Sequence, residues 1–228
     1  MSQSSIVKID QGNQTKIVGG NVMNDRFNEL PEEKQRAVFN AAIEVFAKYD
    51  YKKASTDLIA AKAGVSKGLL FYYFHNKKEL YLAVFDYVSR IISESIFDSK
   101  LAEITDFFEL ITYATMKKVK VLESSPYIID FCVRSFYSEK EDVSGDLKNA
   151  NLQTINNNYN IYFKKLDYSR FKEGANPDQI FKMLIWMMDG YLHEQQMYGK
   201  ALHLDEIENE LRAWTKMLKS IAYKEEYL

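Results

Sequence analysis

Proline, glycine and cysteine are scarce in this chain of 228 residues, which contains only 3 prolines, 9 glycines and 1 cysteine. So few helix-breaking residues favour long, uninterrupted helices over a β-rich fold. The single cysteine, Cys132, excludes a disulfide framework within one chain and is typical of a reducing compartment. No apolar run reaches the roughly 18 residues of a membrane span, and the N-terminus lacks the apolar core of a signal peptide. We therefore expect an all-α cytoplasmic protein that does not enter a membrane.

Motifs that would indicate an enzyme are also missing. The sequence contains no HExxH pair, no glycine-rich phosphate loop and no nucleophile elbow. His193, Glu194 and His203 come nearest to a catalytic or metal-binding cluster, but Gly199 interrupts the helix between the two histidines. The acidic segment 138–146 departs from the EF-hand pattern. We predict no catalytic site, no metal site and no cofactor.

The most informative segment runs from residue 55 to residue 78, with the sequence STDLIAAKAGVSKGLLFYYFHNKK. Ser55 or Thr56 can cap the start of a helix, and Gly64 suits the left-handed position at its end. Ser66 can cap a second helix directly afterwards. Two short helices joined by a tight turn predict a helix-turn-helix, which presents its second helix to the DNA major groove.

At these residues the chain resembles the DNA-binding domain of the TetR family of transcriptional regulators. The resemblance covers residues 31–88, and Phe71 departs from it where tyrosine is usual. It rests on Thr56, Ile59-Ala60, Ala63-Gly64-Val65-Ser66, Gly68, Leu70, Tyr73-Phe74, Lys77 and Leu80. It implies a homodimer that binds double-stranded operator DNA and usually represses transcription until an unknown small-molecule effector binds.

Candidate DNA contacts lie at the starts of the two helices, along the second helix, and just after it. The set comprises Thr56, Ser66, Lys67, Gly68, Leu69, Phe71, Tyr72, Tyr73, His75 and Lys77. Simpler roles stay open for some of them, because Thr56 can be only a helix cap and Lys67 or His75 only a surface residue. Gly68 lowers helix propensity, which indicates that another molecule comes close to the backbone there.

The distribution of charge is consistent with DNA contact through one end of the molecule. Residues 31–90 hold 10 Lys and Arg against 7 Asp and Glu, a net charge of +3. Residues 91–228 hold 17 against 22, a net charge of −5. A basic head on an acidic body would direct one end toward nucleic acid.

Three regions follow from the pattern along the chain. Residues 1–28 are predicted to be a flexible extension or leader, residues 29–88 the DNA-binding domain with its helix-turn-helix at about 55–74, and residues 89–228 an effector-binding and dimerisation domain. About nine helices are expected in all. A helix from Lys77 to about Ile96 should link head and body, followed by helices near 104–121, 126–138, 144–166, 177–199 and 204–224.

The last two helices resemble the pair that forms the dimer interface in this family. Their apolar stripes contain Ile180, Leu184, Met187, Met188 and Tyr191 on the first and Leu211, Trp214, Leu218 and Ile221 on the second. The alternative is that both stripes belong to the core of one chain. Without a dimer, a head with so few basic residues should bind DNA weakly.

An effector pocket in the body is also implied by the resemblance. Candidate lining residues are Tyr113, Phe131, Cys132, Phe136, Tyr159, Phe163, Trp186 and Met187, although each can equally be ordinary core. An apolar or aromatic effector is expected, since no cluster of arginines is evident. The effector would shift the helix that begins at Lys77 and thereby separate the two heads. The alternatives left open are a helical adaptor that binds protein, and a small all-α enzyme.

Overall fold

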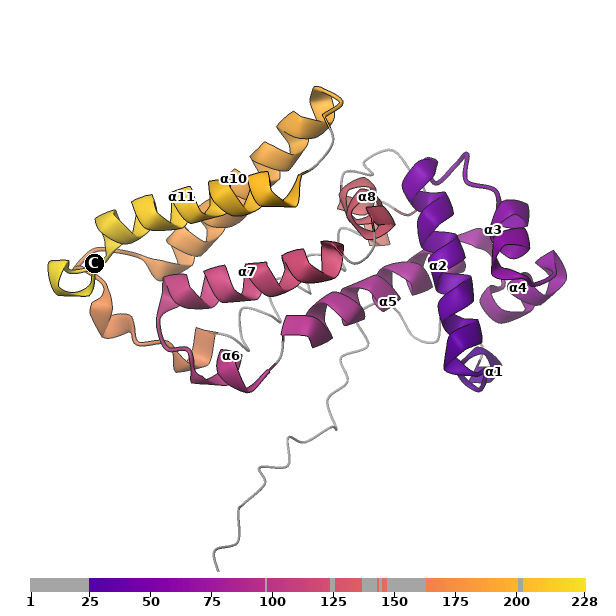
Figure 1. The fold of residues 1–228 in the computed structure, drawn as a ribbon, viewed down its shortest axis with the longest axis horizontal. Coiled ribbons are helices and arrows are strands. Elements are labelled where there is room, and N and C mark those ends of the chain that lie inside the picture. Colours follow the sequence, from indigo (N-terminus) through magenta and orange to yellow (C-terminus); the bar gives the residue numbers. More distant parts are fainter. Residues whose placement is uncertain are drawn as a thin grey trace, which may run out of the picture.

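The computed structural model describes residues 25–96, 98–123, 126–136, 143, 145–146, 163–200 and 203–228. Its helices form an elongated molecule, with the N-terminal helices at one end and the C-terminal pair at the other (Figure 1). The described residues are helical apart from turns and one isolated bridge between Phe171 and Tyr223.

The α-helices follow one another closely along the chain. They are α1 (Asp25–Asn28), α2 (Glu32–Lys48), α3 (Thr56–Ala63), α4 (Lys67–Phe74), α5 (Lys77–Ile96), α6 (Ser99–Glu103), α7 (Phe107–Glu123), α8 (Pro126–Phe136), α10 (Pro177–Met197) and α11 (Leu204–Ala222). Short 3-10 helices cover Phe163–Lys165, Tyr168–Arg170 and Glu225–Tyr227. The all-α prediction is confirmed, and α5 has the predicted bounds. Most of the helix expected at 144–166 lies outside the described residues.

The helix-turn-helix forms as its capping residues predict. The Ser55 hydroxyl accepts a hydrogen bond from the Leu58 amide at 3.3 Å, and the Ser66 hydroxyl accepts one from the Leu69 amide at 3.2 Å. Between the two helices, Gly64 adopts a left-handed backbone with φ of 69°. Each local feature therefore satisfies or permits a helix end, which is why this turn can be read from the sequence.

The N-terminal boundary needs a correction, because the predicted flexible segment 1–28 ends in an ordered turn of helix. Phe27 in α1 is completely buried. Its ring packs edge-on against Phe39, Tyr73 and Phe74, with centroid distances of 5.3, 5.4 and 4.7 Å. Phe27 thus joins α2 to α4, and we place the start of the head at Asp25. Residues 1–24 lie outside the described part of the chain.

Substituting Phe27 with alanine is expected to destabilise the protein by about 3–5 kcal/mol, because it removes a fully buried aromatic ring. The same change at exposed Asp25 in α1 should stay within about 0.5 kcal/mol. Urea denaturation followed by circular dichroism measures both free energies of unfolding. A loss below about 1 kcal/mol at Phe27 would show that α1 is not part of the folded head.

Helix α8 belongs to the body by sequence position but packs on the head. Phe131 of α8 is fully buried, with its ring centroid 5.3 Å from that of Tyr81 and 6.5 Å from that of Phe46. Arg134 donates from Nε to the Ala47 carbonyl at 2.6 Å and from Nη1 to Asp50 at 2.9 Å. The Arg134 guanidinium therefore binds the C-terminal end of α2, where the carbonyls lack helical partners.

A second core holds the body together at its far end. The rings of Phe108 and Phe171 pack edge-on against Tyr223, which is fully buried, and Phe107 packs in turn against Phe171. The Tyr223 hydroxyl accepts a hydrogen bond from the Phe107 amide at 3.2 Å. The C-terminal end of the chain is thereby fastened to the start of α7.

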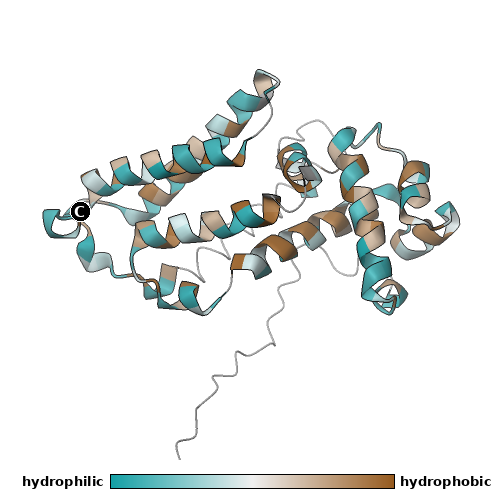
Figure 2. Cartoon of the chain, in the orientation of Figure 1, coloured by the Kyte–Doolittle hydropathy of each residue, from teal (hydrophilic) through white to brown (hydrophobic). Residues whose placement is uncertain are grey.

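Hydrophobic residues are concentrated along α5 and the neighbouring parts of α7 and α8 (Figure 2). Among the helices that the structure describes, none combines the length and the apolar character required to cross a bilayer.

Candidate DNA-binding surface and effector cavity

Helix α4 has one buried face and one exposed face. On one face of α4, Leu70 and Phe74 are completely buried. On the other side, Leu69 and Tyr72 keep 38% and 44% of their surface exposed, although both are large and mainly apolar. Lys67 and Gly68 are exposed at the start of the same helix. A short helix that exposes such residues can offer contacts both to phosphates and to base edges.

Gly68 is not required by the packing of its own chain. A β-carbon built on this residue would meet no heavy atom within 4 Å among its described neighbours. Glycine costs helix stability relative to alanine, and here no intramolecular contact offsets that cost. The open space above Gly68 suits the close approach of a DNA backbone.

Tyr73 and Phe71 do not share the exposed face. Tyr73 is only 7% exposed, and its ring packs against Phe27. The prediction of Tyr73 as a DNA contact is therefore corrected, because its position along α4 turns it toward the core. Phe71 is half-buried.

Basic groups surround the exposed face of α4. Lys67 forms an ion pair with Asp57 of α3 at 2.9 Å. Lys77 lies over the Tyr51 ring, 4.7 Å from its centroid, and donates a hydrogen bond to the Lys52 carbonyl at 3.1 Å. Arg26 lies 5.9 Å from the ring centroid of Tyr72. Of the remaining predicted contacts, Thr56 is half-buried and Ser66 and His75 are exposed.

A tight turn at His75 sets the angle between α4 and α5. His75 has a φ of 53° and a ψ of −46°, and the Asn76 amide donates to the Phe74 carbonyl at 2.5 Å. This hydrogen bond across one residue defines a γ-turn of the rarer, strained kind. Helix α4 is therefore joined to α5 by a sharp, well-defined corner.

A cavity of about 420 Å³ lies within the body, in the size range of small-molecule sites. It is bounded by α7, α8, α10, α11 and the 3-10 turn at Phe163. Its apolar lining residues are Leu110, Ile111, Ala114, Val119, Leu122, Ile129, Val133, Phe163, Phe181, Leu184, Ile185, Met188, Leu192, Leu204, Ile207 and Leu211. Such a lining favours a mainly apolar occupant.

Four other lining residues are polar or ionisable: Thr115, Lys118, Cys132 and Asp189. Burial raises the pKa of the Cys132 thiol to about 12, so the thiol is neutral and a poor nucleophile at neutral pH. Burial also lowers the pKa of Lys118, because the charged ammonium loses its hydration. The described residues contain no group of three or more His, Cys, Asp or Glu side chains arranged to hold a metal ion.

The cavity includes two of the eight predicted pocket residues, Cys132 and Phe163. Tyr113 instead donates to Asp98 at 2.5 Å, and Phe131 packs into the head core. Trp186 is 60% exposed, and Met187 packs against the body core without lining the cavity. These four assignments are corrected. The Phe136 side chain and Tyr159 lie outside the described residues.

The predicted dimer stripe also needs correction. Ile180, Leu184, Leu211 and Leu218 are at least 92% buried within a single chain, so they form its own core. Met188 lines the cavity, and Tyr191 packs edge-on against Trp214 with 6.1 Å between ring centroids. Ile221 is the residue of the predicted stripe that stays largely exposed to solvent, at 66%.

Exposed apolar residues also lie on α10 and α11, outside the buried part of the predicted stripe. Met183 and Trp186 are one turn apart on α10, and Met217 and Ile221 are one turn apart on α11. Their exposed fractions are 38, 60, 50 and 66%. We call these four residues the outer stripe. Large apolar side chains grouped in this way indicate an interaction surface.

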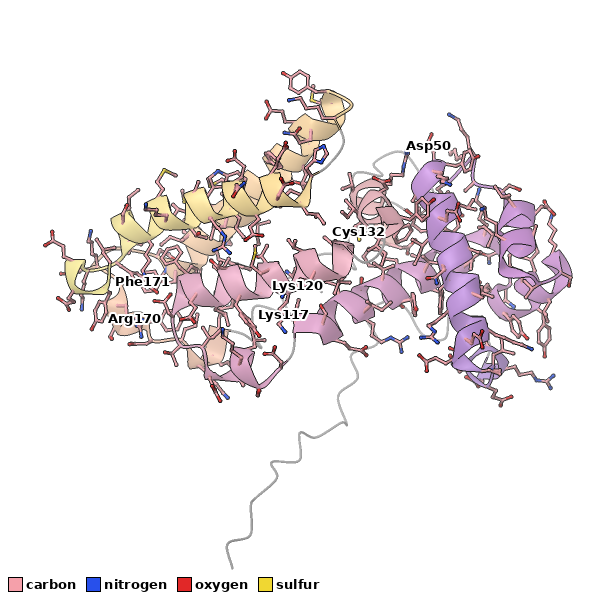
Figure 3. The ribbon with its side chains drawn as sticks, viewed as in Figure 1. Asp50, Lys117, Lys120, Cys132, Arg170 and Phe171 are labelled. Atoms are coloured by element: carbon pink, nitrogen blue, oxygen red, sulfur yellow. The ribbon has the colours of Figure 1, made fainter. Side chains whose placement is uncertain are left out.

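Helix α8 connects the cavity to the head. Ile129, Cys132 and Val133 line the cavity, whereas Phe131 and Arg134 on the same two turns contact α2 and α5. Figure 3 marks Cys132 on α8 and Asp50 at the end of α2, the two elements that Arg134 joins. No α5 residue is among the described cavity lining, although α5 packs against α7 and α8, which both line the cavity. The predicted shift of α5 by an effector stays a prediction.

Sequence comparison identifies the head. The profile of the family described as "Bacterial regulatory proteins, tetR family" matches residues 38–84. The transcriptional activator FasR of Mycolicibacterium smegmatis is 44% identical over 72 residues, which are 31% of this chain and 33% of that protein. The regulator RutR of Escherichia coli is 41% identical over 51 residues, 22% of this chain and 24% of RutR. The matched segment thus spans a third or less of these relatives.

Structural comparison extends the likeness to the body. The fatty acid degradation regulator FadR of Bacillus halodurans superposes with a TM-score of 0.65 at 17% identity, covering 81% of this chain and 97% of that one. The regulator TylP of Streptomyces fradiae gives a TM-score of 0.65 at 16% identity, with coverages of 86 and 89%. At this level of identity the likeness concerns the fold alone.

These relatives are transcriptional regulators rather than enzymes. The capped helix-turn-helix and the match over residues 38–84 identify the head as a DNA-binding domain of the TetR type, and the chain shares the helical fold of solved regulators of that family.

Proposed function

We propose that the protein is a dimeric, DNA-binding repressor that leaves its operator when a small, mainly apolar molecule fills the body cavity. The observation that carries this proposal is the division of α8 between the cavity wall and the head. A regulator needs two sites and an element that both of them touch. α8 meets that requirement.

The DNA-binding part of the proposal rests on α4. Its exposed face offers Lys67, Gly68, Leu69 and Tyr72, and its caps hold it rigidly against α2 and α3. One such helix covers only a short stretch of major groove. Two copies, held one helical turn of DNA apart, would read a symmetric site.

Dimerisation through the outer stripe would supply the second copy. α10 and α11 lie at the end of the molecule opposite α4 and expose apolar residues there (Figure 1). A four-helix bundle formed by these two helices and the same helices of a second copy would bury Trp186 and Ile221, which are otherwise exposed to solvent.

The proposed response of DNA binding to an effector depends on Arg134, which joins α8 to the head. A molecule that enters the cavity would press on Cys132 and Val133 and displace α8. Since Arg134 binds Ala47 and Asp50, a shift of α8 would rotate α2 and the helix-turn-helix with it. The effector must bind the rotated state more tightly than the DNA-bound state for this to release DNA.

A solved regulator of the same fold supports an apolar effector. FadR of Bacillus subtilis was crystallised with stearoyl-CoA, and it superposes with a TM-score of 0.59 at 16% identity. Stearoyl-CoA is the ligand of that protein, and for the present chain it supports only the general expectation of a mainly apolar effector. For the present chain, the apolar lining of the cavity is the stronger argument.

The DNA-binding proposal is tested by selecting fragments from a random DNA pool with the purified protein. Fluorescence anisotropy at several salt concentrations would then compare the enriched duplex with a scrambled one. We expect an inverted repeat, two subunits per duplex and a clear preference over scrambled DNA. Equal affinity for both duplexes, with the same salt dependence, would indicate electrostatic attraction only and would contradict the proposal.

A further inference from the structure

We propose that the cavity binds an amphiphile with a long apolar tail and a single carboxylate, and that Lys118 binds the carboxylate. This inference rests on the proposed effector response and names the chemical class of the effector. It starts from the position of one cation in a cavity whose walls are otherwise mostly aliphatic.

Lys118 lies within an apolar stripe along α7. Leu110, Ala114 and Leu122 line the cavity at positions eight and four residues before it and four residues after it. Residues four apart lie on the same side of a helix, so Lys118 interrupts an otherwise aliphatic wall. Its neighbour Lys117 points elsewhere and forms an ion pair with Asp98 at 2.6 Å.

No anion of the described chain neutralises Lys118. It makes no hydrogen bond or ion pair with the described residues, and burial is the sole cause of its lowered pKa. Lys118 is half-buried, and a half-buried ammonium without a protein partner loses part of its hydration without a replacement hydrogen bond. A carboxylate delivered by a ligand would supply the missing acceptor.

The other ionisable groups of the cavity do not fill this role. Cys132 on α8 is neutral because of its raised pKa. Asp189 on α10 has an interaction of its own, and it contributes nothing to the pKa of Lys118. The described part of α11 contributes only Leu204, Ile207 and Leu211 to the lining. Among the described lining residues, Lys118 is therefore the one cation beside a long apolar space, which matches a single acidic head group on an apolar tail.

The shape of the wall also favours a chain over a compact ring system. From Leu110 to Leu122 the lining follows α7 for 12 residues, or about 18 Å at 1.5 Å per residue. Lys118 lies nearer the Leu122 end of this wall, which is the end of α7 that precedes α8 in the chain. A carboxylate there would place the acidic head toward that end of the cavity.

The test uses the full-length protein, tetradecanoate as the acid and tetradecanol as its uncharged counterpart, with binding measured by displacement of the neutral dye Nile red. We expect the acid to bind roughly 10-fold tighter or more, the scale of one charge-assisted hydrogen bond. Lys118→Met should abolish this preference while the alcohol still binds. Lys118→Arg should largely retain it.

Calorimetry in buffers of different ionisation enthalpy supplies a second readout. Because the pKa of Lys118 is lowered when the cavity is empty and a bound carboxylate would raise it, the acid should bind with proton uptake at pH values between these two pKa values, and its affinity should fall as pH rises through that range. The alcohol should show neither effect.

Equal affinity for acid and alcohol, or an unchanged preference in Lys118→Met, would overturn the inference. So would stearoyl-CoA binding more tightly than octadecanoate and independently of Lys118. A separate anisotropy experiment on operator DNA distinguishes the two proposals. If the acid binds through Lys118 but DNA affinity does not change, the carboxylate site stands and the effector response fails.

Discussion

Replacing both Trp186 and Ile221 with glutamate is expected to make the protein monomeric and to weaken operator binding by at least about 100-fold. The two side chains are 60 and 66% exposed and lie on neighbouring helices, α10 and α11. In a dimer they would be enclosed by the partner, where two glutamates from each chain would be buried without counterions. The dimer should therefore dissociate without loss of the monomer fold.

DNA affinity is expected to fall because the two DNA-binding heads are no longer joined in one dimer. When two heads are joined, the second binds as if at high local concentration, which commonly adds two to four orders of magnitude in avidity. A monomer would keep the contacts of one α4 helix only. Sedimentation velocity would measure the mass, and anisotropy would measure DNA affinity on the same samples.

Leu228→Glu provides a matched control, because Leu228 is 63% exposed but lies outside the outer stripe. It should leave both mass and DNA affinity unchanged. A double variant that remains a dimer would place the interface elsewhere. One that becomes monomeric but binds DNA as before would show that a single head suffices.

Tyr72→Ala is expected to weaken binding to the selected operator by at least about 30-fold. A specific base contact is worth about 1–3 kcal/mol, and the symmetric dimer would lose two of them. Tyr72 is 44% exposed on α4, so its removal should cost the fold little. The salt dependence should stay the same, because no charge that faces phosphate is lost.

Tyr168→Ala is the control for this measurement. Tyr168 is 43% exposed and belongs to the body, far from α4 along the chain. Operator affinity should not respond to it. If Tyr72→Ala also leaves affinity unchanged while circular dichroism shows a folded protein, α4 is not the reading helix in the orientation proposed here.

The helix-turn-helix could be predicted because its determinants are local. Ser55, Gly64 and Ser66 each act on the backbone within three residues of themselves, so the sequence contains the complete signal. Phe27 could not be placed in this way. Its polar neighbours suggest a flexible segment, and its contacts with α2 and α4 exist only once the head has folded.

The interface and the cavity depend on which side of a helix faces inward. α10 carries apolar residues on both sides, Leu184 toward the core and Trp186 toward solvent, so periodicity alone cannot distinguish them. Aromatic content does not identify the pocket residues, because Phe131 and Tyr113 have other partners. In the sequence, the pair Lys117-Lys118 resembles a solvated helix face, so Lys118 does not stand out as a cavity residue. The spacing of four between Ala114, Lys118 and Leu122 was the available signal.

The most direct test of the account fills the cavity without any effector. Ala114→Phe places a ring in the cavity beside α7, and Ala102→Phe at an exposed position of α6 serves as control. Operator affinity would be measured by anisotropy for both variants, after circular dichroism has shown that they are folded. The account predicts at least about a 5-fold loss for Ala114→Phe, the lower end of typical coupling between sites, and none for the control. A folded Ala114→Phe protein that binds the operator as tightly as the parent would contradict the coupling of cavity and DNA-binding head through α8.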